Sequence, residues 1–337
     1  MATVIAIFDI TTKEKESFER YFTGSKFKVL MFEGTIAKTP IYEYKDAEIV
    51  SIYTTSQVNS EILAHMPKLR LIACRSTGFD NVDAKAAKKH NVTICNVPAY
   101  GQTTVAEYAI MLMLMMARKM PAVLSSVEDG QIEYKKLTGF TLHGKTLGVV
   151  GTGKIGQAVI AIAKAIGMHI IAFDPFPNIE AAKKLGFSYV KLPELLAGAD
   201  IVTLHAPLTP ENKHLISKKQ LEQMKQRAIL INTARGELVD TVALIEALRS
   251  KHIAGAALDV IEGERTMDAN TEHDLLRADE KVLFEIAEID LLSKMKNVIL
   301  SPHNAFNSAE ALHIIRKTTT ENITGFLAGK PQNVVRL

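Results

Sequence analysis

The sequence has few of the features that mark secreted, membrane-spanning or nucleic-acid-binding proteins. It holds only two cysteines, Cys74 and Cys95, too few for a disulfide scaffold and consistent with a reducing compartment. Basic residues exceed acidic ones by only three, 40 against 37, so no nucleic-acid or anionic membrane partner is expected. The longest apolar run, residues 108–117, is too short for a bilayer, which needs about 20 residues. The first residues, MATVIAIFDI, lack a basic segment before an apolar run, so we expect no secretory signal and a cytoplasmic protein.

The 337 residues are enough for about two domains. Short apolar runs that predict strands alternate with segments that predict helices, which is typical of parallel sheets covered by helices. In the first half we expect strands at 4–8, 49–53, 69–73 and 92–95, and helices at 11–21, 57–65 and 83–90. In the second we expect strands at 147–150, 169–173, 201–205, 229–232, 256–260 and 298–301, and helices at 154–166, 180–184, 218–224, 242–250 and 309–327.

Two segments differ from this alternation. Residues 103–120 are rich in Met and Leu and predict one long helix, with Thr103 as its N-cap, that is buried on several sides. A plain core helix and a helix between domains or subunits fit it equally well. Residues 263–296 are acidic and fit the alternation poorly, so we expect surface loops and short helices there.

The first motif with a chemical meaning is glycine-rich. Gly151-Thr-Gly153-Lys-Ile-Gly156 follows an expected strand and opens an expected helix, the context in which G-x-G-x-x-G binds a dinucleotide. The helix N-terminus would hold the pyrophosphate. Asp174 ends the next strand, 23 residues after Gly151, where a carboxylate accepts hydrogen bonds from the adenosine ribose and repels a 2′-phosphate. The pattern therefore predicts NAD rather than NADP.

Candidate catalytic residues follow other expected strands. Arg235 is suited to grip a substrate carboxylate with two parallel hydrogen bonds, and His303 can exchange a proton with a carbonyl oxygen while Glu264 keeps it protonated. Asp259 ends a strand between them, and His205 ends another, where it either lines the cofactor site or is structural. Each residue alone also fits a structural role, but together they favour hydride transfer to a 2-keto acid. No spacing of His and Cys predicts a metal site, and no nucleophile motif predicts a hydrolase.

These motifs occur in the order found in the D-isomer-specific 2-hydroxyacid dehydrogenases, which the chain resembles over almost its whole length. Arg75-Ser-Thr-Gly78-Phe-Asp80-Asn-Val-Asp83, Asn96-Val-Pro98-Ala-Tyr100 and His303-Asn-Ala-Phe306 also resemble that family. The strongest similarity within it is to the fermentative D-lactate dehydrogenases.

The resemblance implies an α/β fold of two doubly wound parallel-sheet domains. A flavodoxin-like substrate domain would comprise residues 1–100 and 301–337, and a Rossmann NAD-binding domain residues 101–300. It also implies a homodimer or higher homo-oligomer that uses the long Met-rich helix. The implied catalytic residues are Arg235, Glu264 and His303. The implied substrate-binding residues are Tyr53, Thr77, Gly78, Tyr100, Arg235 and Phe306. The implied cofactor-binding residues are Gly151, Gly153, Lys154, Ile155, Gly156, Asp174, His205, Pro207, Asn212, Thr233, Ala234 and Asp259.

The implied reaction is the NADH-dependent reduction of pyruvate to D-lactate and its reverse. Two alternatives stay open: a dehydrogenase for bulkier 2-keto acids such as 2-ketoisocaproate, and an NAD-sensing binding protein of the same fold. Tyr53 and Phe306 favour a small apolar side chain on the substrate, and the absence of a low-complexity stretch favours the enzyme.

Overall fold

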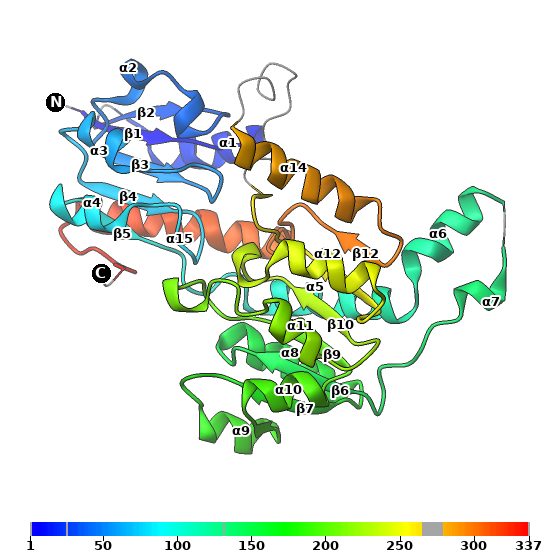
Figure 1. Cartoon of the computed structure of the whole chain (residues 1–337). Coiled ribbons are helices and arrows are strands. Elements are labelled where there is room, and N and C mark those ends of the chain that lie inside the picture. The colour runs from blue at the N-terminus through cyan, green and yellow to red at the C-terminus, as the bar shows by residue number, and fades with distance from the viewer. Residues whose placement is uncertain (1, 25, 131, 265–278, 336–337) are drawn as a thin grey trace. The chain divides into compact units, whose positions relative to one another are not determined.

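The computed structural model describes residues 2–24, 26–130, 132–264 and 279–335, which form two compact units (Figure 1). Unit 1 comprises Met1–Tyr100 and Asn307–Leu337, and unit 2 comprises Gly101–Phe306. The chain therefore passes between the units after Tyr100 and after Phe306, whereas the sequence placed the second passage near Ser301.

Unit 1 is built on a five-stranded parallel sheet in the order β2-β1-β3-β4-β5, the order of flavodoxin-like folds. Its strands are β1 (Thr3–Ile7), β2 (Phe27–Met31), β3 (Ile49–Ile52), β4 (Leu71–Cys74) and β5 (Thr93–Cys95). One face packs against α1 (Thr12–Tyr21) and α15 (Ala309–Leu327). The other packs against α2 (Ile41–Tyr44), α3 (Ser60–Ala64) and α4 (Ala84–Lys89).

Unit 2 is built on a seven-stranded parallel sheet in the order β12-β11-β10-β9-β6-β7-β8. Counted along the unit this is 3-2-1-4-5-6 with one further strand, the Rossmann order. The strands are β6 (Thr146–Val150), β7 (His169–Phe173), β8 (Ser188–Tyr189), β9 (Ile201–Leu204), β10 (Ile229–Asn232), β11 (Gly255–Leu258) and β12 (Val298–Leu300). The helices are α5 (Gln102–Ala117), α6 (Met120–Glu128), α7 (Tyr134–Leu137), α8 (Lys154–Ala165), α9 (Ile179–Leu185), α10 (Leu192–Gly198), α11 (Lys218–Gln223), α12 (Thr241–Arg249) and α14 (Glu280–Ser293).

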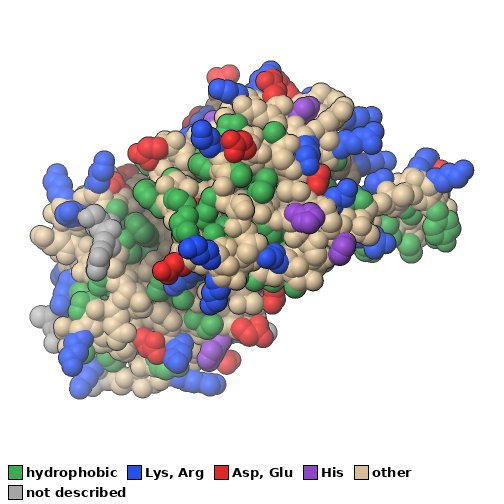
Figure 2. All heavy atoms as spheres, turned by 90° about the horizontal axis from the view of Figure 1, so that it is seen from below, with side chains coloured by type: hydrophobic (Ala, Val, Ile, Leu, Met, Phe, Trp, Pro, Cys, Tyr) green, Lys and Arg blue, Asp and Glu red, His purple; other side chains and the backbone are tan. Residues whose placement is uncertain are grey.

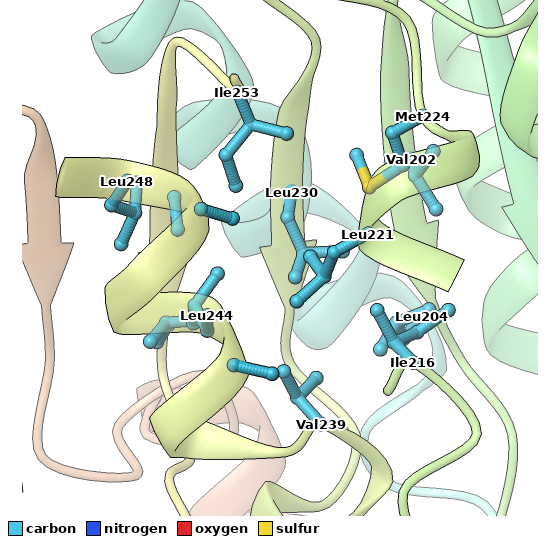
Figure 3. Packing of buried hydrophobic residues seen from close by; sticks show 14 of the residues in the cluster. Val202, Leu204, Ile216, Leu221, Met224, Leu230, Val239, Leu244, Leu248 and Ile253 are labelled. Atoms are coloured by element: carbon cyan, nitrogen blue, oxygen red, sulfur yellow. The ribbon is translucent and has the colours of Figure 1, made fainter. Parts of the chain in front are cut away.

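Helices cover both faces of the larger sheet, which is why its central strands are mostly apolar. In β10, Leu230 points to the cluster that α10, α11 and α12 cover (Figure 3). Its neighbours Ile229 and Ile231 point to the opposite cluster, which α5 and α8 cover. Successive side chains of a strand point to opposite faces, so this run of isoleucine and leucine serves two cores at once. The expected α/β fold of two parallel sheets is confirmed.

The Met-rich segment forms two helices rather than one. Helix α5 begins at Gln102 after Gly101, so Thr103 is not its N-cap, and the helix ends at Ala117. Pro121 explains the end, because in a continuous helix its ring would clash with the carbonyl of Ala117, four residues earlier. Lys119 takes a left-handed conformation with φ 52°, and the Ala117 carbonyl accepts a hydrogen bond from the Phe140 N–H instead (2.9 Å).

Two other parts of the fold differ from the sequence expectations. Where loops and short helices were expected at 263–296, the chain forms a helix of 14 residues, α14, whose Ile289 and Leu292 are buried. Residues 265–278 of this segment lie outside the described residues. The edge strands β2 and β8 were not expected, and β8 has only two residues.

Candidate functional site

The carboxyl ends of the unit 2 strands carry the sequence-predicted cofactor-binding and catalytic residues. Strand order reverses between β6 and β9, and ligands of doubly wound sheets bind at such a switch point. Gly151 follows β6 and His205 follows β9. The two strand ends approach closely, because a Cβ on Gly151 would lie 2.7 Å from the backbone nitrogen of Ala206.

The glycine-rich turn has the geometry that a pyrophosphate needs. Gly151 has φ +90°, a conformation that favours glycine, and a Cβ on Gly156 would collide with the carbonyl oxygen of Gly151. At Gly153 nothing in the described chain lies within 4 Å of a Cβ position, so the backbone there is open to a ligand. The twelve-residue helix α8 starts directly afterwards with Lys154 and Ile155. Its unpaired N–H groups and dipole fit a phosphate.

Two buried polar atoms at this edge fit a bound polar ligand. The Nδ1 of His205 and the Oγ1 of Thr233 have no hydrogen-bond partner within the described residues. Buried polar atoms are nearly always paired, so a pair of unmatched ones beside the switch point favours a bound group. The loop after β9 is held by its own bonds, since the Asn212 amide donates to the Pro207 carbonyl (2.7 Å). These residues fit a dinucleotide.

Asp174 follows β7 and is held by three hydrogen bonds. Its Oδ2 accepts from the backbone N–H of Thr152 (2.7 Å) and from the Thr152 hydroxyl (3.0 Å). Its Oδ1 accepts from the Phe176 N–H (2.9 Å). The carboxylate is therefore tied to the glycine-rich turn.

His303 and Glu264 form a pair across 39 residues of sequence. The His303 Nδ1 lies 2.8 Å from the Glu264 Oε1, so Nε2 is the ring nitrogen that remains for proton exchange with a substrate. His303 has φ 48°, an uncommon conformation for a side-chain-bearing residue. Its backbone N–H donates to the Asp259 carbonyl (2.8 Å), which helps to hold that conformation.

The two histidines at this edge differ in their readiness to take a proton. Burial favours the neutral form of His303, but the hydrogen bond and charge of Glu264, with the charge of Asp259, outweigh it, so the His303 pKa is raised. Arg235 is close enough to oppose that rise. Desolvation lowers the pKa of His205 to about 3. Of these two, His303 alone can act as a proton donor near neutral pH.

Asp259 organises the loop that carries His303. Its side chain is 1% exposed, and Oδ1 accepts from the Ser301 hydroxyl (2.6 Å) and the Asn304 N–H (2.8 Å). Its Oδ2 accepts from the Ala305 N–H (2.8 Å). The buried carboxylate thus fixes the segment on both sides of His303.

Arg235 follows β10 on a loop shaped by a buried amide. The Asn232 side chain accepts from the Ala234 N–H (3.0 Å) and donates to the Arg235 carbonyl (2.8 Å). The Nη1 of Arg235 donates to the Ala234 carbonyl (2.7 Å), which holds one side of the guanidinium. The positive charge of the Arg235 guanidinium is close enough to His303 to act on its pKa.

The predicted substrate-binding residues of unit 1 also follow strands, with Tyr53 after β3 and Thr77 after β4. The Tyr53 hydroxyl donates to Glu14 Oε1 (3.2 Å), and its ring lies 4.1 Å from the Arg75 guanidinium. The Thr77 hydroxyl donates to the Val97 carbonyl (2.8 Å), and the Gly78 carbonyl accepts from the Ser76 hydroxyl (2.6 Å). Tyr100 is the last residue of the first segment of unit 1, Met1–Tyr100. Phe306 lies in unit 2, and the centre of its ring is 6.3 Å from that of His303.

Three residues that contact these groups were missed from the sequence. Arg75 is fully buried and pairs with Glu14 (3.3 Å) beside Tyr53, and the Tyr189 hydroxyl lies 2.7 Å from that of Thr152. The capping-box pattern Thr11-x-x-Glu14 was the only available signal for Glu14. Arg75 begins a segment that resembles the family, but its contact with Glu14 had no sequence signal, and Tyr189 had none, since each contact joins distant segments.

Within the described residues, no group of three or more His, Cys, Asp or Glu side chains is arranged to hold a metal ion. In the same residues no single helix has the length and apolarity to span a membrane. Only α5 and α6 pass that test, and only when taken together across their 62° bend.

Comparison with known proteins gives one family. Residues 110–305 match the model of the D-isomer specific 2-hydroxyacid dehydrogenase NAD binding domain. The chain is 36% identical over 329 residues to the D-lactate dehydrogenase of Escherichia coli, covering 97% of each chain. It is 36% identical over 310 residues to the glycerate dehydrogenase of Methylorubrum extorquens, covering 90% of each. Its fold matches the D-lactate dehydrogenase of Aquifex aeolicus, solved with NAD and lactic acid, with a TM-score of 0.88 and 30% identity over 97% and 96% of the two chains.

The glycine-rich cradle on a Rossmann sheet and the matches over nearly the whole chain agree with one another. The chain belongs to the D-isomer specific 2-hydroxyacid dehydrogenases and uses NAD as its cofactor.

Proposed function

We propose that this enzyme reduces pyruvate to D-lactate with NADH and catalyses the reverse reaction. The likeness to D-lactate dehydrogenases supports pyruvate as the substrate. The pairing of His303 with Glu264 is the observation that carries the proposed proton transfer to a 2-keto acid. The glycerate dehydrogenase relative favours a substrate with a more polar side chain, and a bulkier 2-keto acid is the other alternative.

The proposed roles follow from the site geometry. Bound NADH supplies the hydride. Arg235 binds the substrate carboxylate and keto oxygen, and His303 Nε2 gives its proton to that oxygen as the hydroxyl forms. Glu264 holds the imidazole through Nδ1, which sets the ring orientation and favours the protonated form. In oxidation, His303 takes the hydroxyl proton back.

The other predicted site residues keep their proposed roles. The glycine-rich turn with Lys154 and Ile155 holds the pyrophosphate, and Asp174 the ribose. The residues proposed to border the cofactor are His205, Pro207, Asn212, Thr233, Ala234 and Asp259. Those proposed to bind the substrate are Tyr53, Thr77, Gly78, Tyr100 and Phe306. We further propose a cytoplasmic enzyme whose partners are a small 2-keto acid and copies of itself.

The test is NADH oxidation by the purified enzyme with pyruvate, 2-ketoisocaproate, hydroxypyruvate and glyoxylate. We expect the highest kcat/KM with pyruvate and D-lactate as the product. A higher kcat/KM with another acid would reassign the substrate. NADH binding without turnover of any acid would favour a binding protein.

The pH dependence tests the His303–Glu264 pair. Reduction needs protonated His303, so kcat/KM falls as pH rises through its pKa. Glu264→Gln keeps the shape but removes the charge that raises this pKa, so the alkaline limb of the profile should move to lower pH. The loss should be small in acid and large in alkali. Profiles of the wild type, Glu264→Gln and the exposed control Glu310→Gln measure this, and a uniform loss at every pH would contradict the pairing.

We also propose a homodimer or higher homo-oligomer. Hydrophobic side chains gather on the arm formed by α6 and α7 (Figure 2). Leu124 is 53% exposed and Val127 is 63% exposed, and on α5 Met111 and Leu114 are also exposed. Burial of such side chains by a second copy would be favourable. Light scattering should give at least twice the chain mass of 37.1 kDa, and Leu124→Glu with Val127→Glu should lower it. A wild-type mass of one chain would contradict the proposal.

A further inference from the structure

We propose that Tyr189 is a positioning residue for cofactor choice: through Thr152, it orients the Asp174 carboxylate that separates NAD from NADP. The proposal rests on the role proposed above for Asp174 at the ribose, and it requires no particular 2-keto acid. Tyr189 belongs to the short edge strand β8 and was not among the residues predicted to bind the cofactor. Its hydroxyl lies 2.7 Å from that of Thr152, inside the glycine-rich turn.

The groups at the two ends of this hydrogen-bond series, the Asp174 carboxylate and the Asn178 N–H, determine the direction of each hydrogen bond between them. The Asp174 carboxylate can only accept, so the single hydroxyl proton of Thr152 is donated to Oδ2 (3.0 Å). Thr152 Oγ1 must then accept from the Tyr189 hydroxyl. The Tyr189 oxygen in turn accepts from the Asn178 N–H (3.0 Å), which leaves its own proton for Thr152. The series therefore runs one way, from Asn178 to Asp174, and bonds aligned in this way strengthen one another.

The count of acceptor positions shows what this series does for Asp174. A carboxylate has about four lone-pair positions. Thr152 occupies two of them on Oδ2, and the Phe176 N–H occupies one on Oδ1. The carboxylate is thus held in one orientation, with acceptor capacity on Oδ1 for a ribose hydroxyl. A fixed negative charge in that place also repels a 2′-phosphate more effectively than one that can rotate away.

Tyr189 is itself held in place from three sides. It pairs with Ala172 of β7 in the parallel ladder, and the ring of Phe187 packs edge-on against it at 5.1 Å. The Asn178 N–H fixes its hydroxyl. Thr152 is 4% exposed, so the Tyr189–Thr152 bond is shielded from competing water. A rigid phenol thus links the turn after β6 to the segment after β7.

The test measures binding rather than turnover. Kd values for NADH and for NADPH are obtained by titration, following the fluorescence of the reduced nicotinamide. Tyr189→Phe should raise the Kd of NADH about threefold to tenfold, the effect of one lost hydrogen bond. It should not raise the Kd of NADPH, because a carboxylate that can rotate repels the 2′-phosphate less. The NADPH/NADH ratio of Kd values should fall accordingly. Thr152→Val, which removes the hydroxyl that Tyr189 contacts, should act in the same direction.

Measuring Tyr189→Phe in a protein that also carries Asp174→Ala separates a positioning effect on the carboxylate from a general structural effect of losing the hydroxyl. In an Asp174→Ala background, Tyr189→Phe should change the NADH Kd by less than about twofold, because its effect passes through the carboxylate. The matched control is Tyr44→Phe in unit 1, which removes a buried hydroxyl that donates to the Ile36 carbonyl (3.0 Å) and should leave both Kd values unchanged.

Three results would overturn the proposal. These are an unchanged Kd ratio in Tyr189→Phe, an equal effect in the Asp174→Ala background, and a wild type that binds NADPH as tightly as NADH. None of them depends on which 2-keto acid is reduced, so this test and the substrate assay can fail independently.

Discussion

Replacement of His303 by glutamine is expected to lower kcat for 2-keto acid reduction by about 10²- to 10⁴-fold, the usual contribution of a general acid. Glutamine can still form a hydrogen bond to Glu264, but its amide is too weak an acid to transfer a proton to a carbonyl oxygen. The lowered pKa of His205 prevents that residue from taking over. The measurement is steady-state kcat with the best acid of the substrate panel, together with the NADH Kd, which should stay within about twofold of the wild type.

Exposed His313 on α15 provides the control, since His313→Gln makes the same chemical change at a residue with no proposed role. A loss of kcat below tenfold in His303→Gln would exclude this residue as the proton donor. A parallel loss of NADH affinity would instead indicate that the loop held by Asp259 had rearranged. Thermal unfolding distinguishes that case, because a displaced loop also lowers Tm.

Replacement of Arg235 by lysine is expected to lower kcat/KM about 10- to 150-fold, with both a higher KM and a lower kcat. Lysine keeps the positive charge but loses the planar fork that binds a carboxylate through two parallel hydrogen bonds. The Nη1 bond to the Ala234 carbonyl, which holds the guanidinium, is lost with it. NADH affinity should change little, since the loop shape depends on Asn232.

The matched control is Arg249→Lys, in the last turn of α12, where the side chain is exposed. It should leave both KM and kcat unchanged. A loss of NADH binding in Arg235→Lys equal to the loss of kcat/KM would assign Arg235 a structural role. An unchanged KM for the 2-keto acid would remove it from substrate binding.

The sequence alone was enough for the alternation of strands and helices, and all ten expected strands form. Parallel strands buried on both faces, such as β10, are short runs of apolar residues bounded by polar ones, and that signal is local. The glycine-rich turn is local for the same reason, because its three glycines and its helix are continuous in sequence. The residues that follow these strands could therefore be named before the fold was known.

The break between α5 and α6 could have been predicted from the sequence, because Pro121 has no N–H to donate a helical hydrogen bond to the Ala117 carbonyl. Strand β8 was harder, since its two residues are too few for a pattern, and β2 was missed although four of its five residues are apolar. Helix α14 was misread because its acidic composition hides the spacing of Ile289 and Leu292.

What the tertiary structure alone decided is how polar side chains distant in sequence meet. The sequence contains His303 and Glu264 but not their 2.8 Å separation, and the contact of Tyr189 with Thr152 had no signal in it. The buried Arg75–Glu14 pair beside Tyr53 was equally invisible. A hydrogen bond requires two atoms within about 3 Å, a condition that spacing along the chain does not express. Residue identity and strand order determined which chemistry was possible here, and packing determined which of those groups act together.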